Sequence, residues 1–203
     1  VDLLVIHDLD AEELGSEDAV DHHLKQLDSS GFKALDNLRA VGEIKGVGVG
    51  LNVLGMIPRF LERFDIDVFL VAMPYSLIDQ TGLDRELAIC SENNIGIITG
   101  EPYASGVLAA GPESESTFNY TPTPLPVLDK VRRIQLVCDR HGVHLRAAAL
   151  QFLLEHESVA TVIPGMTSQW EVLDNLAMLE VDIPPDFWLE LKADGLLRAD
   201  APT

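Results

Sequence analysis

The sequence predicts an α/β fold in which helices cover a parallel sheet, and three observations carry this prediction. First, five short runs are apolar almost throughout, which is typical of parallel strands buried on both faces. Second, helical patterns separate these runs, as in a chain of strand–helix units. Third, polar or small residues follow all five runs. A (β/α)₈ barrel builds its site from the loops after many strands, whereas an open doubly wound sheet forms its site at one switch point. The pattern therefore favours a barrel. The predicted strands are Val1–Asp8, Ile44–Asn52, Ile66–Met73, Ile95–Thr99 and Val159–Ile163.

The segments between the strands carry helical patterns with recognisable ends. Residues 11–30 are acidic and polar, and we expect a solvated loop or a surface helix there. Asp84 is a candidate N-cap for a helix that stops at Asn93-Asn94, and Ser168 is a candidate N-cap near the end of the chain. Residues 111–126 have no apolar period and predict a long loop, a kind of segment that is often functional. The other predicted helices are Phe32–Val41, Val53–Phe64, Leu125–Arg140, Leu145–Glu155, Gln169–Leu179 and Pro185–Leu197.

The composition of the chain limits the classes of protein to which it can belong. The chain has 203 residues, 47% of them hydrophobic, and no Pro/Gly/Ser-rich linker, so residues 1–203 are expected to form a single globular domain. The formal net charge of −19 argues against nucleic acid or an anionic membrane as a partner. No apolar run approaches the roughly 18 residues of a membrane span, and no signal-peptide pattern occurs, so we expect a cytoplasmic protein. Cys90 and Cys138 lie far from any metal-binding spacing and are expected to be reduced core thiols.

Two motifs invite a functional interpretation that the sequence does not support. Gly46, Gly48 and Gly50 resemble a nucleotide fingerprint, but that motif needs its glycines in the turn after a strand, and here they lie within one. We therefore interpret them as close-packing positions in a crowded barrel interior. His22 and His23 are adjacent and point apart on a helix, and no third ligand lies at a useful spacing, so no metal site is expected.

His7 stands at the carboxyl end of the first strand, where parallel sheets place their ligands. Two interpretations of this residue are open from the sequence. It could cap the strand and be satisfied by a neighbouring carbonyl or by Asp8, or it could be a catalytic histidine. Asn52 ends the second strand in the same way and could present an amide to a ligand.

Taken in order, five segments resemble the aldo-keto reductase family, whose members fold as (β/α)₈ barrels. Val1–Asp8 resembles the fourth barrel strand, which in this family ends in a catalytic histidine, and Ile44–Asn52 resembles the fifth. No single segment is specific, but the ordered set is. The resemblance covers essentially the whole chain, and it implies a partial barrel made of strands four to eight, their helices and a C-terminal helix.

The other three segments follow in the order that the family has. Pro74-Tyr75-Ser76-Leu77 resembles the segment after the sixth strand, and Ser105-Gly106-Val107-Leu108 resembles the phosphate-binding loop after the seventh. Val162-Ile163-Pro164-Gly165, followed by Asp174-Asn175-Leu176, resembles the eighth strand and the cofactor helix. The sequences GVGLN and AALQF and the pair Asp79-Gln80 are similar to the sugar and pyridoxal dehydrogenases within the family.

The resemblance implies hydride transfer between a nicotinamide cofactor and a carbonyl or hydroxyl carbon of a sugar or small aldehyde. The family uses an aspartate, a tyrosine, a lysine and a histidine, with the tyrosine as general acid or base. Only the histidine has a counterpart here, His7, because the other three belong to the first three units. Tyr75, Tyr103 and Tyr120 do not lie at the matching place and are not assigned this role.

The resemblance also places cofactor contacts, and these point to NAD, with NADP as the alternative. This chain has Ala72 where the family often has a carboxamide-binding glutamine, and Gly100 where it often has a stacking aromatic. NADP-preferring members place a cation near the positions of Thr167 and Glu171, and a carboxylate there would repel a 2′-phosphate. Gly165, Met166 and Thr167 lie at the start of a helix, where the backbone N–H groups of the first turn favour anions. The implied cofactor residues are Asn52, Tyr103, Ser105, Gly106, Leu108, Gly165, Met166, Thr167, Glu171, Asp174 and Asn175.

Three hypotheses about the chain follow. It is a portion of an aldo-keto reductase without its amino-terminal units, or a non-catalytic nicotinamide-binding or regulatory protein on the same scaffold, or a chain that self-associates to bury its open edges. Removing three strands from a closed barrel exposes two apolar edges, so the missing barrel part or a second copy is an expected partner. A small carbonyl compound or sugar is the expected substrate. The loops at residues 8–30 and 111–126 are expected to select it, and neither carries a readable signature.

Overall fold

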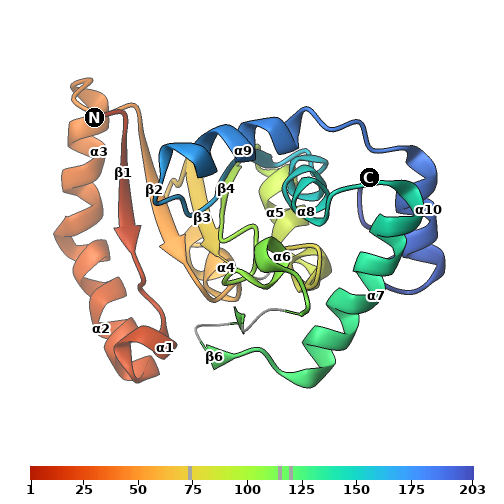
Figure 1. Cartoon of the computed structure of the whole chain (residues 1–203). Helices are drawn as coiled ribbons and strands as arrows, with labels where there is room; N and C mark the ends of the chain where they lie inside the picture. The colour runs from red at the N-terminus through yellow and green to blue at the C-terminus, as the bar shows by residue number, and fades with distance from the viewer. Residues whose placement is uncertain (73–74, 114–115, 119–120) are drawn as a thin grey trace.

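The computed structural model describes residues 1–203 except 73–74, 114–115 and 119–120, and it is built around one parallel sheet (Figure 1). The strands follow one another in the order β1-β2-β3-β4-β7, and each neighbouring pair is parallel. In a doubly wound sheet the order reverses at a switch point, so this sequential order excludes that alternative. The strands are β1 (Leu3–His7), β2 (Gly46–Leu51), β3 (Val68–Ala72), β4 (Gly96–Gly100) and β7 (Val159–Ile163).

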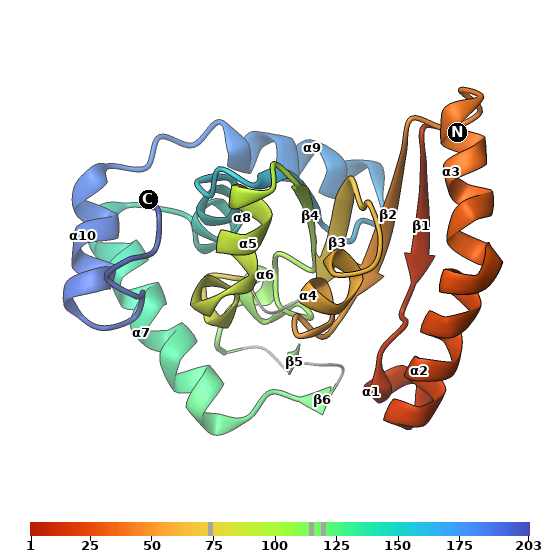
Figure 2. The same cartoon turned by 180° about the vertical axis from the view of Figure 1, so that it is seen from behind.

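The helices cover one face of the sheet. Val47, Val49 and Phe69 point to that face and are fully buried in the apolar core, whereas Leu3 and Val5 on the other face are each 40% exposed. The segment from α2 to α3 lies alongside β1 in both views (Figure 1, Figure 2). The helical elements are α1 (Ala11–Leu14), α2 (Glu17–Gln26), η1 (Leu27–Gly31), α3 (Phe32–Ala40), α4 (Met56–Leu61), η2 (Thr81–Asp84), α5 (Glu86–Glu92), α6 (Val107–Ala110), α7 (Leu125–His141), α8 (Leu145–Leu154), α9 (Gln169–Leu179) and α10 (Pro185–Ala193).

Most predicted elements are confirmed, and the differences have local causes. The acidic segment after β1 folds into α1 and α2, and it is not solvated throughout, because Val20 and Leu24 are fully buried. Asp84 is not the N-cap of α5; its carboxylate pairs with the guanidinium of Arg198. The predicted loop at residues 111–126 contains a short hairpin, β5 (Thr117–Phe118) and β6 (Thr121–Pro122). Met73, Pro74 and Tyr120, named above, lie outside the described residues.

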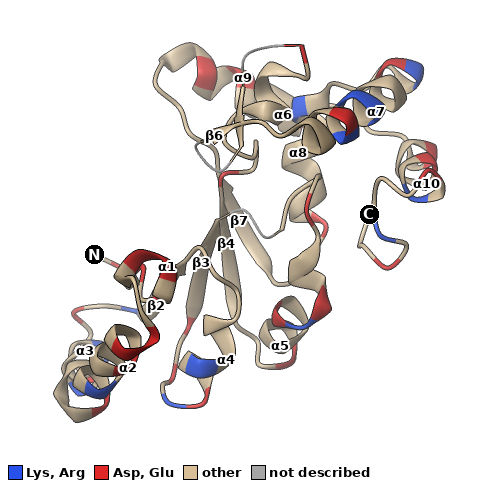
Figure 3. Cartoon of the chain, turned by 90° about the horizontal axis from the view of Figure 1, so that it is seen from below, with Lys and Arg blue, Asp and Glu red and all other residues tan. Residues whose placement is uncertain are grey.

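Charged side chains are confined to helices and loops (Figure 3). The five strands of the sheet carry no Asp, Glu, Lys or Arg, so every charge can remain in contact with water or with an opposite charge. Arg59 on α4, for example, bonds Glu17 and Asp21 on α2, each at 2.8 Å. Among the described residues, no helix has both the length and the hydropathy to cross a lipid bilayer.

The two cysteines are free and fully buried, as the sequence predicts. Burial raises the pKa of the Cys90 thiol to about 11 and that of the Cys138 thiol to about 12. Since the thiolate is the reactive form, neither residue is suited to nucleophilic or redox chemistry in the folded protein.

The glycines of β2 are close-packing positions, as predicted. A Cβ at Gly48 would lie 2.8 Å from Cγ1 and 3.0 Å from the carbonyl oxygen of Val68. A Cβ at Gly46 would lie 2.9 Å from Cδ2 of Leu3. Side chains of β1 and β3 therefore lie over the glycines of β2. This alternation between neighbouring strands is the packing rule of barrel interiors, where each layer takes its side chains from alternate strands.

Gly48→Ala is expected to destabilise the fold by about 1–3 kcal/mol, because the new methyl group meets a backbone atom that cannot rotate away. Gly50→Ala is the matched control on the same strand. Its Cβ would lie no closer than 3.6 Å to Cγ1 of Val5, an ordinary contact. The free energy of unfolding from urea denaturation compares the two variants. Equal losses in both would contradict the close-packing role of Gly48.

Candidate functional site

The carboxyl ends of the parallel strands meet at one edge of the sheet, and His7 lies at this edge. Its side chain is 84% exposed, and its Nδ1 lies 3.2 Å from Oδ2 of Asp8. Asp8 itself has a left-handed backbone with φ of 45°, an uncommon conformation for a residue with a side chain. The turn at Asp8 thus places a carboxylate against the histidine ring and leaves the rest of the ring open to a ligand.

Asp8 connects His7 to the end of the next strand. The Nδ2 of Asn52 donates to Oδ1 of Asp8 across 3.5 Å, at the limit of a hydrogen bond. Asn52 also lines a surface cavity of about 460 Å³, with Glu12 and Arg85 among its other lining residues. The structure therefore brings together two residues that the sequence predicts, His7 and Asn52, through a third, Asp8, to which the sequence gives no functional role.

The loop after β4 has an unusual backbone. Glu101, Ala104, Ser105 and Gly106 all have positive φ, at 51°, 49°, 55° and 105°. Two backbone N–H groups of this turn are occupied, because Ala104 donates to the carbonyl of Glu101 at 2.8 Å and Gly106 donates to the carbonyl of Tyr103 at 3.0 Å. The Oγ of Ser105 is buried and has no partner among the described residues. The loop thus offers a ligand the hydroxyl of Ser105, and not the backbone N–H groups of Ala104 and Gly106.

Tyr103 joins this loop to α9. Its hydroxyl donates to Oδ1 of Asn175 at 2.5 Å, and the two residues are only 9% and 8% exposed. Burial raises the pKa of Tyr103 to about 12, partly offset by the nearby charge of Arg146. The phenol therefore stays protonated near neutral pH and acts as a hydrogen-bond donor. The sequence places Tyr103 and Asn175 at the cofactor, and in the structure they bond each other.

The N-terminus of α9 is capped from within. The predicted cap is confirmed, because Oγ of Ser168 accepts from the backbone N–H of Glu171 at 3.3 Å. In return, Oε2 of Glu171 accepts from the N–H groups of Thr167 and Ser168 at 2.5 Å and 2.9 Å, so the two residues form a capping box. These bonds lower the pKa of Glu171. The expectation that Gly165, Met166 and Thr167 offer free N–H groups to an anion needs correction at Thr167, whose N–H is taken by Glu171.

Two further residues that the sequence predicts as cofactor contacts make contacts within the protein near this helix. Asp174 forms an ion pair with Arg146 of α8, and the second contact of the pair, Nη2 to Oδ1, measures 3.2 Å. Leu108 is fully buried, and its N–H donates to the carbonyl of Tyr103 at 3.1 Å. Leu108 can therefore shape the loop but presents no free polar group to a ligand. Gly165 and Met166 are exposed ahead of α9.

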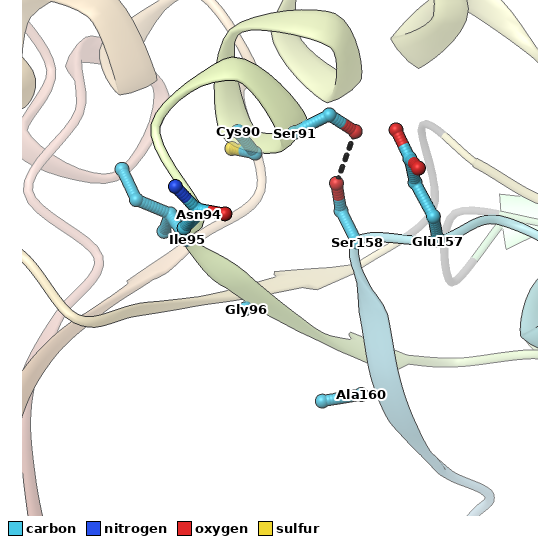
Figure 4. Close-up of a pocket in the computed structure, with 8 residues that line it drawn as sticks. All are labelled: Cys90, Ser91, Asn94, Ile95, Gly96, Glu157, Ser158 and Ala160. Carbon is cyan, nitrogen blue, oxygen red and sulfur yellow. Dashed lines mark hydrogen bonds between the residues drawn. The ribbon is translucent and has the colours of Figure 1, made fainter.

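A second cavity, of about 320 Å³, lies at the opposite end of the strands (Figure 4). Gly96 begins β4 and Ser158 precedes β7, so this cavity sits at the amino ends. Two of its polar groups bond each other, since Oγ of Ser91 and Oγ of Ser158 are 2.6 Å apart. In barrels the chemistry is carried by the carboxyl ends, so we do not assign the site here. No cluster of three or more His, Cys, Asp or Glu side chains suited to a metal occurs in the described part of the chain.

The sequence reasoning missed three residues at the carboxyl edge. Asp8 and Arg146 orient predicted residues, and Thr117 donates to the carbonyl of Ser105 at 2.9 Å, which places the β5–β6 hairpin against the loop after β4. Asp8 could have been found from its position next to His7. The other two come from distant segments, and no local pattern identifies them.

The whole chain is similar to proteins of known family. A sequence model of the Aldo/keto reductase family matches residues 1–193. The chain is 35% identical to a pyridoxal 4-dehydrogenase of Microbacterium luteolum and 32% identical to a D-threo-aldose 1-dehydrogenase of a Pseudomonas species, in each case over 97% of this chain and 57% of the relative. It thus spans little more than half the length of these relatives. A solved aldo-keto reductase from Bacillus halodurans, in holo form, aligns with a TM-score of 0.70 at 19% identity, over 99% of this chain and 62% of that one, and so shares its fold.

Tyr103→Phe is expected to cost about 1–3 kcal/mol of unfolding free energy, because it leaves the buried Oδ1 of Asn175 without its donor. Tyr75→Phe is the control. Tyr75 is also buried, but its hydroxyl has no partner among the described residues, so its removal should be neutral or stabilising. Urea unfolding of both variants tests this difference. A loss in Tyr75→Phe as large as that in Tyr103→Phe would rule out a special role for the Tyr103–Asn175 bond.

Proposed function

Since the chain belongs to the aldo/keto reductase family, we propose that it is the carboxyl-terminal part of an oxidoreductase that transfers hydride between NAD and a sugar or small aldehyde. The observation that carries this proposal is an exposed histidine, held by Asp8, at the carboxyl end of β1, on the same sheet edge as the loop after β4. The curated relatives, a pyridoxal 4-dehydrogenase and an aldose 1-dehydrogenase, support this class of substrate.

His7 is proposed to orient the substrate oxygen. The contact of Nδ1 with Asp8 favours a proton on Nδ1 in the neutral ring, which leaves Nε2 for the ligand. Because the side chain is 84% exposed, a substrate oxygen can reach it without rearrangement of the fold. Asp8 is proposed as the positioning residue, since it contacts both His7 and Asn52.

The residues around the loop after β4 fit a dinucleotide. The cofactor supplies the hydride or accepts it. Ser105 keeps a buried hydroxyl without a partner in the described residues, and this hydroxyl can donate to a phosphate oxygen. The bond between Tyr103 and Asn175 holds this loop against α9. We propose that these residues form one side of the cofactor site, and that Tyr103 holds this side in place through its bond to Asn175.

Glu171 is proposed to select NAD over NADP. Its carboxylate occupies the N–H groups of Thr167 and Ser168, the donors at this helix N-terminus on which a 2′-phosphate would depend. It also places a negative charge where a second negative group would have to enter. Both effects penalise NADP, and neither acts on the uncharged ribose hydroxyl of NAD.

Glu171→Gln should raise kcat/KM with NADP relative to NAD by about tenfold, because it removes the charge that would repel a 2′-phosphate and nearly keeps the size of the side chain. The cofactor preference is measured spectrophotometrically with the protein that carries the amino-terminal portion. Glu180→Gln, at the far end of α9, is the charge-matched control. An unchanged preference in Glu171→Gln would remove Glu171 from the cofactor site.

The sheet is proposed to be the carboxyl-terminal five strands of an eight-stranded barrel. Three observations support this: the sequential order of parallel strands, the alternation of glycines and aliphatic side chains on the open face, and, among the described strands, one unpaired edge on each of β1 and β7. The tyrosine, lysine and aspartate of the family would then come from the amino-terminal units. The proposal requires that the 203 residues alone show no turnover, and measurable activity from them would contradict it.

His7→Ala in the protein that carries the amino-terminal portion should lower kcat by about 10²-fold or more, on the scale of a general acid–base contribution. NADH formation with pyridoxal or an aldose measures the rate. His22→Ala is the control, since His22 is exposed on α2 and is not part of the candidate site. If His7→Ala keeps the normal rate, His7 is a structural strand cap. If NAD binds and no substrate turns over, the non-catalytic alternative is the better description.

A further inference from the structure

A surface cavity of about 460 Å³ lies where the chain leaves three neighbouring strands of the sheet. Glu12 belongs to α1, which follows β1, and Asn52 follows β2. Asp84, Arg85 and Glu86 lie after β3, where η2 ends and α5 begins. The cavity is therefore built at the carboxyl edge, where folds of this class hold their ligands.

The charged groups of this cavity are available to a ligand. The guanidinium of Arg85 has no hydrogen bond or ion pair with another described residue. Its neighbour Asp84 is instead paired with Arg198, so the five N–H donors of Arg85 stay unused. The carboxylates of Glu12 and Glu86 also lack a hydrogen-bond or ion-pair partner in the part of the chain that the structure describes.

The position of Glu12 is fixed by the start of its helix. The backbone N–H of Glu12 donates to Oδ1 of Asp10 at 3.0 Å, and Asp10 is only 1% exposed. This N-cap holds α1 close to the end of β1. Glu12 also lies within residues 8–30, the segment that the sequence predicts to select the substrate.

The lining groups restrict the chemistry of the ligand. Carboxylates only accept hydrogen bonds, a guanidinium only donates them, and the amide of Asn52 does both. An anion would be repelled by Glu12 and Glu86, and a cation would be repelled by Arg85. A flat apolar ring would take these groups out of water without pairing them, and none of the described lining residues is aromatic. Uncharged hydroxyl groups, which both donate and accept, match the whole set.

Asn52 connects the cavity to the proposed reacting end. Its Nδ2 donates to Oδ1 of Asp8 at 3.5 Å, and Oδ2 of Asp8 lies 3.2 Å from Nδ1 of His7. A substrate that reacts at His7 and extends past Asp8 and Asn52 therefore reaches the groups of the cavity.

We propose that this cavity binds the hydroxyl groups of an aldose, with Arg85 and Glu12 as specificity-determining residues. The proposal rests on the proposed function above, and it ranks aldoses ahead of pyridoxal as substrates. A site built to pair hydroxyl groups discriminates against compounds that leave its charged groups unpaired.

The first test compares D-xylose with pyridoxal as substrates, in the protein that carries the amino-terminal portion. Arg85→Ala should raise KM for D-xylose by about tenfold and leave kcat within about twofold, because the lost hydrogen bonds lie away from the reacting carbon. KM for pyridoxal should not change. Glu12→Gln should act in the same direction and covers the case in which Arg85→Ala does not fold. Arg132→Ala is the control, since Arg132 lies on α7 and pairs with Glu113 and Asp129.

The second test does not depend on turnover. Xylitol has the hydroxyl groups of D-xylose and no carbonyl carbon, and its binding without NAD can be followed by saturation-transfer NMR. Arg85→Ala should weaken xylitol binding by about tenfold, and Arg132→Ala should not.

Equal rises of KM for D-xylose and pyridoxal in Arg85→Ala would overturn the proposal, because they would indicate a general structural effect. Unchanged KM values in both cavity variants would also overturn it. Xylitol binding that depends on Arg85, in a protein without NAD-dependent turnover, would reject the proposed function and keep this inference. Turnover of pyridoxal by a protein that does not bind xylitol would keep the proposed function and reject this inference.

Discussion

The structure depends on the close approach of three neighbouring strands. Val68 of β3 comes so near to Gly48 of β2 that a methyl group would not fit between them, and Val5 of β1 lies over the same glycine. Side chains of β1 and β3 can lie over β2 only because Gly48 has no side chain. This contact fixes the register of β1 against β2 and β3. It thereby sets where β1 ends, and so where His7 stands.

The candidate site is held by short-range bonds among its own residues. Asp8 contacts both His7 and Asn52, Tyr103 bonds Asn175, and Glu171 caps its own helix. Polar groups satisfied in this way cost little to bury and stay in place without a ligand. The exception is the Oγ of Ser105, which remains without a partner among the described residues and marks the position where a ligand has most to offer.

Among the described strands, the two at the edges of the sheet are the least buried. No residue of β1 and only Val159 of β7 is buried, whereas β2 is buried throughout, so the burial on both faces that the sequence predicts is wrong for β1 and β7. Leu3, Val5 and Ile163 are between 40% and 48% exposed. The barrel proposed above, completed by units outside these 203 residues, would account for the exposure of β1 and β7.

The sequence alone determined the strands, most helix ends and the chemical character of the strand exits. The capping box at Ser168 and Glu171 and the apolar run of β7 depend on residues close together in the chain, so local patterns suffice for them. Only the tertiary structure decided which groups are free. Asp84 is drawn from its helix end by Arg198, and Asn175 is occupied by Tyr103, because partners 114 and 72 residues away in the chain compete for the same polar atoms.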